Sequence, residues 1–494
     1  MIDLGAALAD MSGMDGLDPE DWSSLRALGH RMLDDMFDHL SRVREEPVWR
    51  PMPPKLRQAL HDKPLPRAQG DAAQAYDTFR TKVLPYTTGN LHPRFMGWVH
   101  GGGNPVGMLA ELLAGGLNAN LGGRDHAPIE VERQVIAWAA EMLDFPPEAS
   151  GLLVTGTSIA NLIGILIART AALGPRVRRE GVGQSRLVAY ASAAAHGCIS
   201  RGMDMAGLGT EALRLIPIDS DGRLQPAALL EMIARDKAEG NRPFLLVGTA
   251  GSVDTGAIDR LDELASIARA AGMWFHVDGA FGALAALSPR LRPLLAGIER
   301  ADSVAFDFHK WAQVPYDAGC ILVRDKSRQL AAFAADAAYL RREQRGLAGG
   351  DTWPCDLGPD LSRGFRALKV WMTLQVYGAD RIGRVVERTC ALAQQLAARV
   401  DAEPELERLA PVALNIVCFR YRARPQEMDR LNTEIVADLQ EAGIAAPSTT
   451  TLQGCLAIRA AIVNHRTRSE DVDILVEAVL EAGRARTKGL KRIA

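Results

Sequence analysis

The sequence lacks an apolar run long enough to cross a bilayer, and it has no excess of one charge. A transmembrane helix needs about 20 consecutive apolar residues, and no such run occurs among the 494 residues. Lys and Arg number 57 and Asp and Glu number 60, which gives a formal net charge of −3. Because phosphate binding depends on clustered basic residues, this balance argues against nucleic-acid and membrane partners.

Cysteine motifs and a secretory leader are also missing. The six cysteines are scattered and show neither a CxxC motif nor the Cys/His spacing of a zinc site. The first 22 residues, MIDLGAALADMSGMDGLDPEDW, carry no basic segment ahead of an apolar stretch, so we expect no signal peptide. These features predict a reduced cytoplasmic protein without a bound metal.

The middle of the chain alternates short apolar runs with helical patterns. Helical patterns at Ile159–Ala171 and Leu261–Ala271 separate some of these runs, which predicts an α/β fold. We expect a mostly parallel seven-stranded sheet with helices on both faces. The seven predicted strands are Leu152–Thr155, Arg186–Ala191, Leu213–Pro217, Pro243–Gly248, Met273–Val277, Ser303–Phe306 and Gly319–Val323.

The N-terminal part is predicted to be a helical arm. Apolar residues recur at helical spacing from Leu25 to Leu40, and the prolines that follow predict an extended connector over 48–70. One thin apolar stripe cannot bury a core of its own. We therefore expect this arm to pack on another surface, such as a second copy of the chain.

The last quarter of the chain has the pattern of a small α+β domain. It predicts two strands and two helices, at Val412–Tyr421, Gly454–Val463, Asp429–Glu441 and Ser469–Ala482. The predicted organisation is an arm over 1–92, an α/β domain over 93–375 and a small domain over 376–494.

Two residues that can do chemistry follow predicted strands. Asp278 ends the run FHVD, at the sheet edge where α/β folds bind their ligands; a turn or capping aspartate is the alternative. Lys310 follows the run at Ser303–Phe306. Burial there would lower its pKa and free the amine to form a Schiff base, whereas an exposed loop lysine is the alternative.

A third feature is the turn between the first predicted strand and its helix. Backbone amides at this helix start, together with the Thr157 and Ser158 hydroxyls, could hold a phosphate; an ordinary helix cap is the alternative. The turn matches neither GxxxxGK[ST] nor GxGxxG, so it does not support ATP or dinucleotide binding.

One cofactor would use all three features. Pyridoxal 5′-phosphate needs an anion site, an acid for its ring nitrogen and an amine for its aldehyde. His196 follows another strand among small residues and could stack on the ring, although a lone histidine is more often structural.

Taken in order, these motifs resemble the group II pyridoxal-phosphate-dependent amino-acid decarboxylases. The family includes the aromatic-L-amino-acid, glutamate, tyrosine and histidine decarboxylases. The resemblance covers nearly the whole chain, and the pair HVD and HKW is its most specific part. The motifs are HPRF at 92–95, VTGTS at 154–158, His196, GTAGS at 248–252, HVDGA at 276–280, HKW at 309–311 and RGFRALKVW at 363–371.

The resemblance implies a fold-type I enzyme with a defined set of catalytic residues. Lys310 would form the Schiff base with the cofactor, and Asp278 would pair with the pyridine nitrogen. His196 would stack on one face of the ring and Ala280 would pack under the other. Thr249 would help to place the ring or the substrate carboxylate.

The resemblance also implies a phosphate site and a homodimer. Thr157, Ser158 and His309 would hold the phosphate. Members of the family are dimers with the active site at the interface and the N-terminal segment swapped onto the partner, which agrees with the arm predicted above. Ser362 could reach the phosphate of the partner subunit.

The substrate pocket is expected to include His92, Phe95 and Trp98. Phe95, Trp98 and the nearby glycines suggest room for a bulky, aromatic amino-acid side chain. Arg94 could instead recognise an acidic side chain, as in a glutamate or aspartate decarboxylase.

The sequence departs from the family pattern in one loop. Family members usually carry a tyrosine there that helps to protonate the intermediate left after CO₂ loss, but residues 341–354 contain none, and Tyr339 lies at the start of the loop. Three glycines would let the loop act as a lid. The expected product is the amine, with His196 or Tyr339 as the acid. Reaction with oxygen to give aldehyde, ammonia and peroxide is the alternative, and an aminotransferase, an aldolase or a non-catalytic protein is less favoured.

Overall fold

The computed structural model describes residues 16–334, 342–350 and 352–493, the side chains of 489–493 excepted. The chain divides into two compact units, one formed by residues up to Glu46 with Arg50–Thr88, and the other by Pro47–Trp49 with the residues from Gly89 onward. Within the described ranges, no helix is both long enough and apolar enough to pass through a membrane.

The first unit is helical. It contains α2 (Trp22–Arg42), α3 (Pro54–His61) and α4 (Ala72–Lys82). The side chain of Asp21 caps α2 by accepting hydrogen bonds from the Ser23 and Ser24 amides. The Tyr76 hydroxyl donates to Asp35 at 2.6 Å and joins α4 to α2. The helix predicted from the stripe between Leu25 and Leu40 is confirmed.

The extended connector predicted over 48–70 is wrong in part, because α3 lies within it. Pro54 occupies the first helical position, where the missing N–H costs no hydrogen bond and the fixed backbone angle suits a helix. Prolines therefore start a helix here instead of excluding one. Val48 lies in the second unit, where its amide donates to the Gly443 carbonyl at 2.9 Å.

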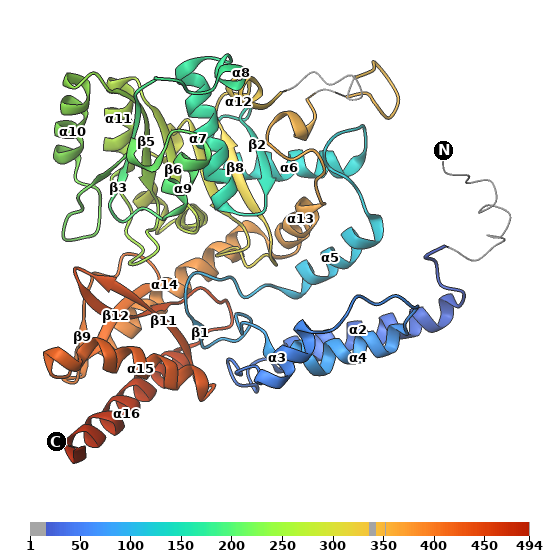
Figure 1. Ribbon diagram of the computed structural model, residues 1–494, viewed down its shortest axis with the longest axis vertical. Coiled ribbons are helices and arrows are strands. Elements are labelled where there is room, and N and C mark those ends of the chain that lie inside the picture. The colour runs from blue at the N-terminus through green and yellow to red at the C-terminus, as the bar shows by residue number, and fades with distance from the viewer. Residues whose placement is uncertain (1–15, 335–341, 351, 494) are drawn as a thin grey trace. The chain divides into compact units, whose positions relative to one another are not determined.

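The second unit contains the predicted seven-stranded sheet (Figure 1). The strand order is β2-β8-β7-β6-β5-β3-β4. The pairs from β7 to β4 are parallel, and β8 runs antiparallel to both of its neighbours. The mostly parallel sheet is confirmed. Its strands are β2 (Ser150–Val154), β3 (Leu187–Ser192), β4 (Leu213–Ile216), β5 (Arg242–Thr249), β6 (Trp274–Asp278), β7 (Ser303–Asp307) and β8 (Gly319–Val323).

Helices cover both faces of this sheet (Figure 1). Buried side chains from one face pack on α7 (Thr157–Leu173), α9 (Cys198–Met205) and α12 (Lys326–Phe333). Side chains from the other face pack on α6 (Ala127–Met142), α10 (Pro226–Ala238), α11 (Leu261–Ala271) and α13 (Arg366–Tyr377). Successive residues of each central strand alternate between these two layers, as a strand buried on both sides requires.

A smaller five-stranded sheet has the order β1-β11-β12-β10-β9. Its strands are β1 (Phe95–Met96), β9 (Leu406–Arg408), β10 (Ile416–Tyr421), β11 (Ala446–Leu452) and β12 (Cys455–Ala461). Its core includes residues of α14 (Ala379–Ala402), α15 (Met428–Glu441) and α16 (Ser469–Ile493). The two predicted strands and two predicted helices are present, while β9, β11 and α14 were not predicted. The domain boundaries at 92 and 375 stay predictions.

A buried ion pair joins three parts of the larger sheet domain. The guanidinium of Arg363, just ahead of α13, lies 2.5 Å from Glu132 on α6. Glu132 also accepts from the Leu153 amide on β2, and Arg363 donates to the Leu153 carbonyl. Both side chains are buried, so each charge depends on the other for its solvation.

We expect the substitution Glu132→Gln to lower the free energy of unfolding by about 3–5 kcal/mol, because it leaves the Arg363 charge buried and unpaired. Denaturant titration measures the change. Glu130→Gln is the matched control on the same helix, since Glu130 and Arg133 form an exposed pair that should contribute less than about 1 kcal/mol. Equal effects of the two substitutions would contradict the expectation.

Candidate active site

A cavity of about 390 Å³ opens at the carboxyl edge of the seven-stranded sheet. The segments that follow β2, β3, β5, β6 and β7 all contribute to its wall, together with the segment that follows β1. This is the edge at which parallel α/β sheets bind their ligands.

Most of the residues predicted from the sequence come together in this cavity. Those that line it are Trp98, Thr157, Ser158, His196, Thr249, Asp278, Ala280, His309 and Lys310. They come from six separate parts of the chain, so their convergence depends on the sheet order and not on sequence proximity.

Three predicted residues lie elsewhere. His92 is buried, and its Nδ1 accepts from the Arg94 amide at 3.0 Å. Phe95 is buried on β1 behind the wall, with its ring centroid 6.1 Å from that of Trp98. Ser362 is exposed and does not line the cavity. Phe95 therefore packs against the wall without lining the cavity, and His92 does not line it either. A role for Ser362 toward a partner subunit stays a prediction.

Lys310 lies between two buried carboxylates. Its Nζ is 2.9 Å from Oδ2 of Asp307, and its side chain is 22% exposed. Burial lowers the pKa of Lys310, but the negative charges of Asp307 and Asp278 together raise it further, so the pKa lies above its ordinary value. The lowered pKa expected from the sequence is therefore wrong, because that expectation did not include a counter-ion.

Asp307 is the main residue that the sequence interpretation missed. It ends β7, as Asp278 ends β6, and this position three residues before Lys310 was an available signal. Its Oδ1 accepts a hydrogen bond from the Thr157 amide at 2.8 Å. One of the α7 amides expected to bind phosphate is thus committed to Asp307. The hydroxyls of the turn and His309 remain as the predicted phosphate ligands.

Asp278 is held in a defined orientation. Its Oδ1 accepts from the Ala280 amide at 3.1 Å. Burial raises the pKa of Asp278 above its ordinary value, and Lys310, this amide and the Asn161 side chain offset only part of that rise. A carboxylate surrounded in this way can meet a protonated ring nitrogen in the cavity.

Two buried hydroxyls give a test of whether pyridoxal phosphate fits. Oγ1 of Thr157 and Oγ1 of Thr249 are buried and have no hydrogen-bond partner within the part of the chain that the structure describes. Both residues line the cavity. Because a buried hydroxyl without a partner is costly, these two sites suit a ligand that brings polar oxygens. The donor set, the acid and the amine therefore fit the cofactor.

Aromatic side chains form another part of the cavity wall. The rings of His309 and Tyr316 have centroids 4.3 Å apart, and His100 meets Tyr316 edge-on at 5.9 Å. Trp98 stacks on His100 at 5.9 Å. Partial burial and the negative charge of Asp307 raise the pKa of Tyr316, so its hydroxyl stays protonated at neutral pH. His100 lies in the segment over 92–104 that was expected to line the substrate pocket, although it was not given a role of its own. Tyr316 was not predicted, because it lies outside the motifs that carry the resemblance.

We expect Asp307→Asn to lower the pKa of Lys310 by about 1–3 units, the usual effect of losing an adjacent opposite charge. The amine would then react at lower pH, while the side-chain oxygen that meets the Thr157 amide is kept. The pH dependence of amine labelling at Lys310, followed by mass spectrometry, measures the shift. Asp317→Asn is the control, because Asp317 pairs with Arg366 in the same region; an unchanged titration in Asp307→Asn would contradict the expectation.

Comparison with known proteins identifies the family of this chain. Residues 53–422 match the model of the pyridoxal-dependent decarboxylase conserved domain. The chain is 31% identical to an aromatic-L-amino-acid decarboxylase of Bacillus atrophaeus over 91% of this chain and 93% of the relative. It is 29% identical to a phenylacetaldehyde synthase of Arabidopsis thaliana over 90% and 93% of the two chains.

A solved structure supports the same relationship. A crystal structure of Oryza sativa TDC with PLP and tryptamine superposes with a TM-score of 0.88 at 26% identity, and the match covers 95% of this chain and all of the other. The fold and cofactor implied by the sequence resemblance are confirmed. The chain belongs to the pyridoxal-dependent decarboxylase family and is a pyridoxal-phosphate-dependent amino-acid decarboxylase.

Proposed function

We propose that this decarboxylase acts on an aromatic L-amino acid and releases the corresponding amine and CO₂. The aromatic wall formed by Trp98, His100 and Tyr316 is the observation that carries the proposal. Flat rings offer apolar surface and edge-to-face contacts to an aromatic side chain. Two relatives support the same substrate class: the Bacillus atrophaeus protein is named as an aromatic-L-amino-acid decarboxylase, and the Oryza sativa protein was solved with tryptamine.

An acidic substrate is disfavoured by the position of Arg94. Its Nε donates to the Ile444 carbonyl at 2.6 Å, and Nη1 lies 3.9 Å from Asp471, so this side chain is directed at the small sheet domain. No arginine is among the described residues that line the cavity. A glutamate or aspartate side chain would therefore find no guanidinium group in this lining to offset its desolvation, and the Lys310 ammonium is already paired with Asp307.

The chain's own residues would divide the work as follows. Bound pyridoxal phosphate supplies an electron sink for the bond that loses CO₂. Lys310 would hold the cofactor's aldehyde carbon and release it to the substrate amine, which frees the lysine amine again, while Asp278 would keep a proton on the ring nitrogen. His196 and Ala280 would fix the ring between them, and Thr249 would orient the ring or the substrate carboxylate.

The phosphate would be held at the start of α7. Thr157 and Ser158 supply hydroxyls there, and His309 lines the same cavity. The Asp307 carboxylate accepts the Thr157 amide, which fixes the turn and keeps it close to Lys310. These residues would bind the phosphate and orient the cofactor, and they would take no part in proton transfer.

After CO₂ is lost, the substrate carbon can be protonated to give the amine or can react with oxygen. Tyr339 lies outside the described residues, and the loop over 341–354 contains no tyrosine. His196 and Tyr316 both line the cavity, and we propose that they supply the proton that yields the amine. The alternative is oxidation to aldehyde, ammonia and peroxide, which the Arabidopsis relative named as an aldehyde synthase favours.

One experiment tests substrate and product together. The enzyme is incubated with tryptophan, phenylalanine, tyrosine, glutamate and aspartate, and CO₂, amine, ammonia and peroxide are measured separately. We expect CO₂ and amine in equal amounts from an aromatic substrate. Peroxide and ammonia in step with CO₂ would replace the amine proposal by the aldehyde one, and turnover confined to glutamate or aspartate would exclude the aromatic proposal.

If His196 and Tyr316 are the proton donors, the variants His196→Asn and Tyr316→Phe should lose amine formation by about 10²-fold or more, the usual contribution of a general acid. Release of CO₂ should fall less, with peroxide rising in proportion. Tyr377→Phe is the matched control, because Tyr377 does not line the cavity. An unchanged ratio of amine to peroxide in both variants would exclude these donors.

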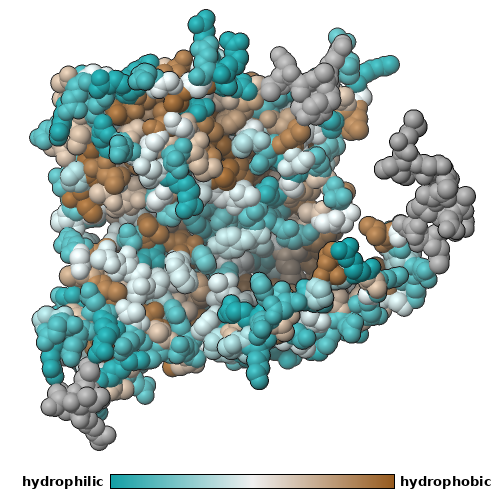
Figure 2. All heavy atoms as spheres, viewed as in Figure 1, coloured by the Kyte–Doolittle hydropathy of each residue, from teal (hydrophilic) through white to brown (hydrophobic). Residues whose placement is uncertain are grey.

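We also propose that the protein is a homodimer in which the N-terminal arm wraps the partner. Within α2 only Leu28 is buried, and Trp22, Leu25 and Phe37 are exposed. In the second unit, α5 (Pro105–Leu117) exposes three leucines, Leu112, Leu113 and Leu117. Figure 2 shows hydrophobic patches on a largely hydrophilic face. Apolar helix faces of this kind are usually covered by another subunit.

The dimer proposal predicts a change of mass. Leu113→Glu should give a monomer in sedimentation measurements, because the interface would have to bury a charge. Leu230→Glu is the matched control on α10, since the two leucines are 54% and 53% exposed. A Leu113→Glu protein with the mass of the unmodified one would exclude α5 from the interface.

We further propose a cytoplasmic location. All six cysteines are free thiols, and free thiols suit a reducing compartment.

A further inference from the structure

A chain of buried polar side chains leads to Asp278 from the far end of its own strand. Nε1 of Trp274 lies 2.8 Å from the Ser303 hydroxyl, which lies 2.7 Å from Nδ1 of His276. Nε2 of His276 lies 2.8 Å from Oδ1 of Asn161. Ser303, His276 and Asn161 are completely buried. The proposed catalytic roles use none of these four residues.

The hydrogen bonds that join these four side chains all run in one direction. Oδ1 of Asn161 can only accept, so Nε2 of His276 carries the proton. Burial lowers the pKa of His276 to about 3, so the ring is neutral and its Nδ1 is an acceptor. Ser303 must therefore donate to Nδ1, and the Trp274 indole N–H donates to Ser303. Every bond thus donates toward Asn161.

Asn161 connects this series of hydrogen bonds to the active site. Its Nδ2 donates to Sγ of Cys198 at 3.2 Å, and hydrogen bonding from the Asn161 side chain lowers the pKa of the buried Asp278 carboxyl. The opposite orientation of the amide would place its oxygen against the anionic carboxylate, which is unfavourable. Each link that donates strengthens the next in a medium of low polarity. The last donor therefore meets Asp278 with a strengthened N–H.

The fold is built to hold this arrangement. Trp274, His276 and Asp278 are alternate residues of β6 and share the face that packs on α7. His276 and Ser303 are register partners on β6 and β7. Gly164 leaves space for the imidazole, because a Cβ at this position would lie 2.7 Å from the His276 ring. A core held together by apolar packing alone would need neither a glycine at position 164 nor these buried polar side chains.

We propose that Trp274, Ser303, His276 and Asn161 are positioning residues for Asp278, which deliver a directed N–H to its carboxylate and keep it aimed at the cofactor's ring nitrogen. We call the four residues the β6 relay. The inference rests on the role proposed above for Asp278. The relay residues do not transfer a proton and do not touch the substrate.

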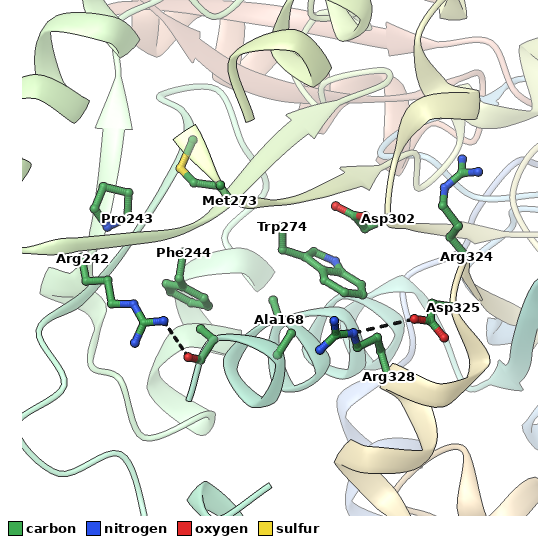
Figure 3. A pocket seen from close by; sticks show the side chains of 13 residues that line it. Ala168, Arg242, Pro243, Phe244, Met273, Trp274, Asp302, Arg324, Asp325 and Arg328 are labelled. Atoms are coloured by element: carbon green, nitrogen blue, oxygen red, sulfur yellow. Dashed lines mark hydrogen bonds and ion pairs between the residues drawn. The ribbon is translucent and has the colours of Figure 1, made fainter. Parts of the chain in front are cut away.

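The first donor of the relay lies at the wall of a second cavity. This cavity of about 490 Å³ lies beside the amino ends of β5 and β6, and Figure 3 shows the Trp274 ring among Phe244, Ala168 and Arg328. Trp274 is only partly buried. Its N–H can therefore be removed by Trp274→Phe without opening a hole in the core, which makes this variant the mildest test of the relay.

The experiment compares two probes on the apoenzyme, pyridoxal phosphate and its 1-deaza analogue, which has carbon in place of the ring nitrogen. Dissociation constants are measured by fluorescence or calorimetry for the unmodified protein, Asn161→Leu, Ser303→Ala and Trp274→Phe. We expect Asn161→Leu to weaken pyridoxal phosphate binding by about tenfold or more, the effect of losing a hydrogen bond to a charged group. Binding of the deaza analogue should stay unchanged.

Ser303→Ala and Trp274→Phe should weaken pyridoxal phosphate selectively as well, by less, because they remove donors further from Asp278. Tyr190→Phe is the matched control: Tyr190 lies on β3 of the same sheet and donates to the buried Asp236 at 2.9 Å, away from the cavity. It should leave both dissociation constants unchanged. Equal weakening of both probes by the relay variants would mean a structural role only and would overturn the inference.

The measurements distinguish a failure of the role proposed for Asp278 from a failure of the β6 relay. If the unmodified protein does not prefer pyridoxal phosphate to the deaza analogue, the role of Asp278 fails, and the relay falls with it. If the unmodified protein has this preference and all three relay variants keep it undiminished, the relay alone is overturned.

Discussion

The site depends on one electrostatic constraint, the placement of two buried carboxylates against a single ammonium group. Asp278 and Asp307 end neighbouring parallel strands, and Lys310 follows Asp307 within the same turn. Charges buried in this way persist only when they are paired and hydrogen-bonded. The parallel order of β6 and β7 brings the acids to one edge, and α7 supplies the Thr157 amide and the Asn161 side chain that hold them.

Much of the fold could be predicted because the central strands are short apolar runs buried on both faces. Asp278 and Lys310 stood out for the same reason, since a polar residue at the end of such a run or a few residues beyond it lies near the ligand-binding edge. The strand–turn–helix at Thr157 added the phosphate site. Helix α14 could also have been found, because Ile382, Val386 and Leu396 have helical spacing and are buried.

The remaining features depend on contacts between distant parts of the chain. The pKa of Lys310 follows from the balance between burial and two carboxylates, and only geometry sets that balance. Strand β11 has the sequence APSTTTL, which has little apolar character and is a strand because β1 and β12 pair with it. Likewise, His100 and Tyr316 become part of one wall only when segments more than 200 residues apart meet.

The short strand β1 has a consequence for how the protein is made. Phe95 and Met96 pair with Ala446 and Pro447, and the Trp98 amide donates to the Ser448 hydroxyl. The segment after β1 forms part of the active-site wall and is thus anchored to residues of the last quarter of the chain. Those anchoring residues do not line the cavity themselves, because the last residue in the lining is Tyr316. During synthesis on the ribosome, the seven-stranded sheet can form first, but the catalytic pocket is completed only after the last quarter of the chain has emerged.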